Sequence, residues 1–163
     1  FIFGGMRSSQ QDMEYSVQQM VEIAVRALST GVNDPFTAIS CIDNLTSTLC
    51  RLMEIEFPSN YRLDSEGELR VVTPKIQFEG MLDAAFNQIR QFSAGSPAVI
   101  IRMMDGLNTL YEFAETEEEK NSIIKHARMV WNVGKRSIDE DNDRNDLQKR
   151  AAIILPDLSR KQL

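Results

Sequence analysis

The sequence has few of the residues on which many enzyme and metal sites depend. Its 163 residues include one histidine, one tryptophan and two cysteines. No cysteine or second histidine stands three or four residues from His126, so a zinc site would need distant ligands. Histidine-based catalytic triads are equally unsupported. We therefore expect no metal, no cofactor and no catalytic residues, and we place His126, flanked by Lys125 and Arg128, on an exposed helix face.

Long apolar runs and positive charge are also scarce. The longest candidate runs, 98–101 and 151–155, are far shorter than the roughly 18 residues that a membrane-spanning helix needs. The net charge of −6 argues against nucleic acid as a partner, because phosphate binding needs concentrated Lys and Arg. It also disfavours adhesion to anionic lipid headgroups.

The two cysteines do not form a disulfide with each other. Cys41 and Cys50 are nine residues apart on one predicted helix. They point to nearly opposite faces and are separated by roughly 13 Å along the axis. We expect free thiols that act as small apolar groups, which fits a reducing compartment.

Apolar residues at intervals of three and four dominate the rest of the chain and predict an all-α fold. We expect five to six helices in an antiparallel or orthogonal bundle. The stripes predicted to face the core include Met13 in the first helix, Phe36 in the second and Phe92 in the third. The expected helices cover residues 8–31, 34–56, 78–92, 97–114, 116–138 and 146–155.

Local signals mark the ends of several predicted helices. Asp34 and Pro35 suit the start of the second helix, and Ser96 with Pro97 suits the fourth. Thr116 and Glu119 have capping-box spacing at the fifth. The acidic stretch 139–145 resembles a calcium loop, but Asp146 and Ala152 replace the required glycine and glutamate, so we read it as a solvated loop that caps the last helix.

One segment departs from the helical pattern. Turn residues 64–67 separate two short stretches, 61–63 and 69–72, and predict a small β-hairpin over 61–72. The chain begins at Phe1 without a methionine, so we interpret it as a piece of a longer protein. We expect 1–6 to end a preceding strand, 7–158 to form a single helical domain and 159–163 to be a frayed tail.

The junction between the first two predicted helices is the most informative stretch. Gly31 is expected to end the first helix in the left-handed conformation. Asn33, Asp34 and Thr37 follow at once, and Arg7 and Asp12 are candidates to join them. Three interpretations stand: a plain turn, a site for a polar or anionic ligand, and a metal-assisted hydrolase site using Asp12, Asn33 and Asp34.

Arg90 is the remaining candidate. Asp83 and Arg90 are seven residues apart and share one face of the third predicted helix. A buried guanidinium needs a carboxylate partner, and Asp34, Asp12 or Asp43 could supply it.

Several motifs resemble a bacterial family of predicted integral membrane proteins. They comprise the string Ala-Leu-Ser-x-Gly-x-Asn-Asp-Pro-x-Thr-Ala at 27–38, the segments 7–12, 19–26, 82–90 and 96–99, and the hairpin. The resemblance covers the chain up to about residue 111. It implies several transmembrane helices followed by a soluble C-terminal region, and it implies no enzymatic activity.

We accordingly expect a domain of a bacterial inner-membrane protein that faces the cytoplasm and binds a ligand or partner or regulates the membrane part. The alternatives are the hydrolase and an oligomerisation module. Expected partners are the protein's own transmembrane region, a second copy and an unidentified small molecule, but not nucleic acid. The candidate binding residues are Arg7, Asp12, Asn33, Asp34, Thr37 and Arg90.

Overall fold

The computed structural model describes residues 13–55, 59–72 and 77–161, and in them it confirms an all-α fold with one hairpin insertion. The helices are α1 (Met13–Ala27), α2 (Pro35–Met53), α3 (Phe78–Phe92), α4 (Pro97–Phe113), α5 (Glu117–Ser137) and α6 (Asp141–Ile154), followed by the 3-10 helix η1 (Pro156–Lys161). The expected strand in 1–6, the helix start near residue 8 and the end of the second helix at residue 56 lie outside the described residues; α2 itself ends at Met53.

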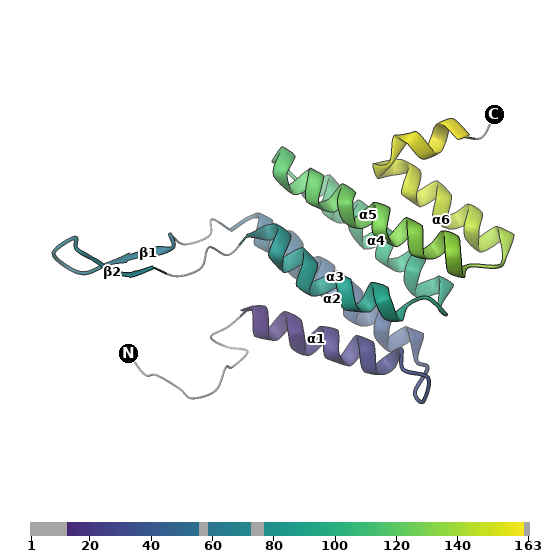
Figure 1. The fold of residues 1–163 in the computed structure, drawn as a ribbon, viewed down its shortest axis with the longest axis horizontal. Coiled ribbons are helices and arrows are strands. Elements are labelled where there is room, and N and C mark those ends of the chain that lie inside the picture. Colours follow the sequence, from purple (N-terminus) through teal and green to yellow (C-terminus); the bar gives the residue numbers. More distant parts are fainter. Residues whose placement is uncertain (1–12, 56–58, 73–76, 162–163) are drawn as a thin grey trace.

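Helix α4 lies between α2 and α5, and α6 packs against another side of α4 (Figure 1). Its side chains Ile100, Met103, Met104 and Leu107 are completely buried because three helices cover them. Helices α1, α2 and α3 pack together on the other side of the bundle. Within the described residues α2 and α6 do not touch, so one face of α4 is left between them.

The helix starts follow the predicted capping chemistry in two of three cases. The Asp34 carboxylate accepts the Thr37 amide at the start of α2, and Thr116 and Glu119 form the full capping box of α5. Ser96 precedes α4 but makes no side-chain capping bond, so only Pro97 at the first helical position supports that start.

Three predicted core residues are exposed. Met13 is 45% exposed, Phe36 79% and Phe92 54%. Each lies in the first or last turn of its helix, where neighbouring helices no longer cover it. The apolar period identifies the inward face, but it does not give the length over which that face is covered.

The predicted boundary of the last helix is also wrong. Helix α6 begins at Asp141, and the stretch expected as a loop forms its first turn. The Glu140 carboxylate accepts the backbone amides of Asn142 and Asp143 and so caps the helix. The acidic residues are tolerated there because negative charge is favourable at a helix N-terminus.

Strands β1 (Tyr61–Leu63) and β2 (Leu69–Val72) form the predicted antiparallel hairpin, which projects beyond the helices (Figure 1). Asp64 organises its turn by accepting the amides of Glu66 and Glu68, while Gly67 adopts a φ of +83°. The two strands contact each other and no described helix.

Cys41 and Cys50 are free and buried, as expected for thiols on opposite sides of α2. Both are covered because α1 and α4 both pack against this helix. Burial raises the pKa of each thiol.

Candidate functional site

The elbow between α1 and α2, residues 28–37, uses its polar groups to hold itself together. One carboxylate oxygen of Asp34 accepts the Thr37 amide at 3.1 Å, and the other accepts the Thr37 hydroxyl at 2.5 Å. The Asp34 amide donates to the carbonyl of Ala27 at 2.8 Å. These bonds, the Thr37 hydroxyl first, lower the pKa of Asp34 below its ordinary value of 3.8. The carboxylate therefore has both oxygens engaged within the turn.

Asn33, and not Gly31, adopts the left-handed conformation at the elbow, with a φ of 48°. The prediction for Gly31 is wrong because the chain makes a further turn after α1 ends. In that turn the amides of Val32 and Asn33 both donate to the carbonyl of Ser29. Asparagine tolerates this backbone region better than most residues with a side chain.

The predicted site residues are only partly brought together. Asn33, Asp34 and Thr37 are adjacent in the elbow, whereas Arg7 and Asp12 lie outside the described residues. Within the described part of the chain, no group of three or more His, Cys, Asp or Glu residues is arranged to hold a metal ion. The hydrolase hypothesis stays a prediction, because Asp12 lies outside the described residues.

Arg90 makes no ion pair with a carboxylate of the described residues. Its Nη2 lies 3.4 Å from the amide oxygen of Asn87, and its buried Nε has no hydrogen-bond partner among the described residues. Two of the three predicted partners are engaged elsewhere, since Asp43 binds Arg102 and Asp34 binds Thr37, and the third, Asp12, lies outside the described residues. Arg90 as a whole is partly buried.

His126 is completely buried between α3 and α5, so its predicted exposure is wrong. Its Nε2 lies 3.0 Å from Asp83 Oδ1, which also accepts the Asn87 amide group at 2.9 Å. Burial lowers the pKa of His126 below 6.5 and outweighs the opposing effect of Asp83. The sequence carried a signal for this position, because His126 continues the inward i, i+3, i+7 pattern from Ile123 to Val130.

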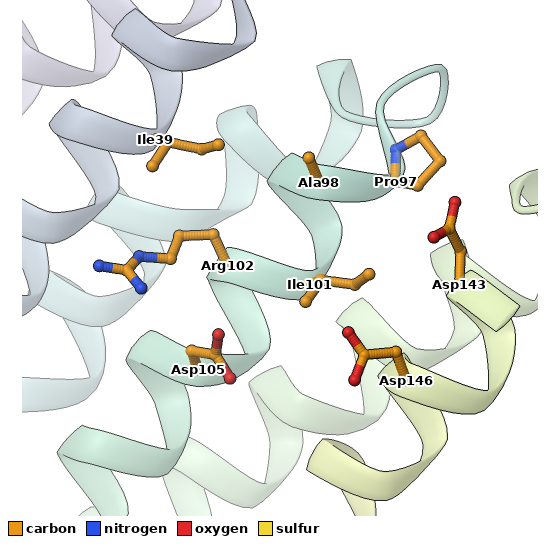
Figure 2. A pocket seen from close by; sticks show the side chains of 8 residues that line it. All are labelled: Ile39, Pro97, Ala98, Ile101, Arg102, Asp105, Asp143 and Asp146. Atoms are coloured by element: carbon orange, nitrogen blue, oxygen red, sulfur yellow. The ribbon is translucent and has the colours of Figure 1, made fainter.

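The candidate site that the sequence reasoning missed is an open depression over α4. Figure 2 shows its first part, a cavity of about 560 Å³ between α2, α4 and α6. Its apolar lining comes from Ile39, Pro97, Ala98 and Ile101, and its charged lining from Arg102, Asp105, Asp143 and Asp146. These residues are far apart in the sequence, so no local motif could have predicted their meeting.

A second cavity of about 390 Å³ continues the first along the helix. The two share Arg102 and Asp105, and we call the combined surface the α4 groove. Its floor follows α4 at four-residue intervals from Pro97 to Phe113. The residues that line only the second part are Asp43, Thr46, Ser47, Cys50, Gly106, Thr109 and Phe113.

The α4 groove carries more negative than positive charge. Arg102 binds Asp43 through two bonds of 2.5 and 2.9 Å, and Figure 2 shows its guanidinium extending away from Asp143 and Asp146. The hydrogen bond to Asp43 raises the pKa of Arg102. Arg150, which bonds to both Asp105 and Asp146, is the second cation. Two cations thus face the four carboxylates of Asp43, Asp105, Asp143 and Asp146, which leaves two negative charges in excess.

Gly106 on α4 faces the side chain of Thr46 on α2. A Cβ atom added at Gly106 would lie 2.6 Å from the hydroxyl oxygen of Thr46 on α2. That hydroxyl is buried without a hydrogen-bond partner among the described residues. The absence of a side chain at Gly106 therefore allows the two helices to pack at this point.

The comparisons with known proteins agree with the resemblance seen in the motifs. Uncharacterized proteins of Mycobacterium bovis and Mycobacterium tuberculosis are 29% identical to this chain over 141 residues. The match covers 86% of this chain but 27% of each mycobacterial protein, so the chain spans about a quarter of its relatives' length. No solved structure gives a significant match.

The family assignment rests on the part of the chain that includes the elbow, the hairpin and most of α4. None of the helices in the described residues combines the length and apolarity required to cross a bilayer. The family model matches residues 1–109, and the chain belongs to the family described as predicted membrane protein (DUF2254).

Proposed function

We propose that this chain is a non-enzymatic binding and regulatory domain of a longer bacterial membrane protein, on the cytoplasmic side of the inner membrane. One observation carries the proposal: the α4 groove follows α4 from Pro97 to Phe113, and its first part lies open between α2 and α6, which do not touch each other within the described residues. A protein segment seated there would contact α2, α4 and α6 at once. It could bias their relative positions, because packed helices shift as rigid bodies.

The chemistry of the groove favours binding over catalysis. Its two arginines already bind carboxylates, and His126 is buried in a different seam of the bundle. Exposed apolar atoms alternate with charged groups, as at protein interfaces. Membership of a membrane-protein family supports a longer polypeptide as the source of the segment.

Protection of a single thiol tests the proposal. Ala98, an exposed residue of the groove, is changed to cysteine after Cys41 and Cys50 are changed to serine. A maleimide reagent should label this thiol more slowly in the full-length protein in membrane vesicles than in the isolated chain. The matched control is Asn132→Cys, an exposed position on α5 outside the groove, which should label equally in both. Equal labelling of Ala98→Cys in both preparations would exclude an occupied groove.

A further inference from the structure

The α4 groove has the length and shape of a helix-binding surface. Its floor is a 17-residue helix, which spans about 25 Å. Partners that bind as helices in grooves use apolar anchors at intervals of three and four residues. The groove offers matching apolar contacts at both ends, from Ile39 and Ile101 at one end and from Phe113 at the other.

An exposed aromatic side chain at one end of the groove supports the same interpretation. Phe113, which lines the second part of the groove, is 48% exposed. Exposed large apolar side chains beside a groove are typical of surfaces that bind a partner. Ala98 is exposed on the groove floor and carries only a methyl group, so a second helix can approach α4 closely at that point.

The charges around the groove indicate which charge a bound partner helix would carry. Asp143 makes no ion pair with any described residue, and Asp105 and Asp146 share the single guanidinium of Arg150. The excess of two negative charges therefore stands along the α6 side, where it would face the polar edge of a bound helix. Complementary charge on the partner steers association and fixes its register.

We infer that the α4 groove binds an amphipathic helix with a Lys- and Arg-rich polar face. This inference rests on the proposed function and names the class of its partner. Basic segments are common beside the cytoplasmic ends of transmembrane helices, so the longer polypeptide is a natural source. The apolar face of the helix lies on Ile39, Ile101 and Phe113, and its basic edge lies along Asp143 and Asp146.

Three synthetic peptides of 16 residues test the inference. All carry leucine at i, i+3, i+4 and i+7 spacing, and their polar positions are lysine, glutamine or glutamate. Binding to the full chain is measured by fluorescence anisotropy at two salt concentrations. The lysine peptide should bind at least about tenfold more tightly than the glutamate peptide, and this preference should shrink as salt is raised.

Charge-removing variants locate the binding. The double variant Asp143→Asn and Asp146→Asn should weaken the lysine peptide roughly fivefold. The matched control removes the same charge from the hairpin, through Glu66→Gln and Glu68→Gln, and should leave binding unchanged. If the double variant lowers the melting temperature, Asp143→Asn alone provides the comparison, because Asp143 makes no ion pair with a described residue.

The outcomes separate the inference from the proposed function. Equal binding of all three peptides, no binding of any, or equal weakening by the hairpin control would overturn the inference. Slower thiol labelling at Ala98→Cys in the full-length protein would still support the proposed function in each of these cases. Equal thiol labelling would instead overturn the proposed function, whichever peptide binds.

Discussion

The elbow between α1 and α2 and the α4 groove are both rich in polar side chains, but they differ in how far those side chains are already bonded. In the elbow, Thr37 occupies both oxygens of Asp34. In the groove, Asp143 has no ion-pair partner among the described residues, and Asp105 shares Arg150 with Asp146. A dense polar motif in a sequence therefore indicates a well-built turn as readily as a binding site, whereas unused bonding capacity indicates a site.

The largest effect is expected from closing the groove floor. Gly106→Ala places a Cβ atom 2.6 Å from the Thr46 hydroxyl, so the Thr46 side chain or α2 itself must shift. Overpacking of this kind costs about 2 kcal/mol, which lowers the melting temperature by roughly 6 °C. Calorimetry measures the change. Thr46→Ala in the same chain should restore most of the loss, and a failure to do so would show that the contact does not limit the packing.

Removing the α2 cap in the elbow should lower the melting temperature less than closing the groove floor. Asp34→Ala removes both bonds to Thr37 and should lower the melting temperature by about 4 °C. Thr37→Val is the matched control because it keeps the capped amide and loses only the hydroxyl bond. An unchanged melting temperature in Asp34→Ala would mean that the elbow does not depend on its cap.

A smaller effect is expected from the backbone strain at Asn33. Asn33→Ala puts a less tolerant residue at a φ of 48° and should lower the melting temperature by about 2 °C. Asn33→Gly should keep or raise it, because glycine adopts this conformation without strain. If both variants destabilise the chain equally, the Asn33 side chain matters more than its backbone conformation.

His126 is a third kind of polar site, one that is fully buried, and a pH titration tests its environment. Burial lowers the pKa of His126. Below about pH 6.5 the histidine of the unfolded state therefore binds a proton, whereas that of the native state stays neutral until the pH is lower. The nearby Lys125 and Arg90 act in the same direction, and Asp83 opposes them. The free energy of unfolding should thus be highest above pH 6.5 and fall as the pH drops through the lowered value. Urea denaturation at several pH values measures this slope, which His126→Gln should reduce. An identical slope in that variant would assign it to other groups.

The sequence predicted features that depend on neighbouring residues. The capping box at Thr116, the Asp34 cap and the hairpin around Gly67 each follow from a few adjacent positions, and all three are present. The start of α6 was placed five residues too late, at residue 146, because a solvated acidic loop and an acid-rich first turn have the same composition.

The features that the sequence did not predict depend on segments that lie far apart along the chain. The α4 groove combines residues 39–50 of α2 with α4 and the start of α6, and nothing in any one segment indicates the others. The burial of His126 depends on α3 packing over α5, which brings Asp83 within 3.0 Å across a separation of 43 residues. The apolar period indicates that His126 lies on the inward face of α5. Its charged neighbours Lys125 and Arg128 favour an exposed position instead, and the prediction followed them.

The hairpin has a consequence for how this chain can change over evolution and in the laboratory. Since β1 and β2 contact no described helix, residues can be inserted between Ser65 and Glu66 without repacking the interior. Such a place tolerates an insertion at little cost to the fold. For the same reason it is the natural point at which to graft a reporter or an affinity tag.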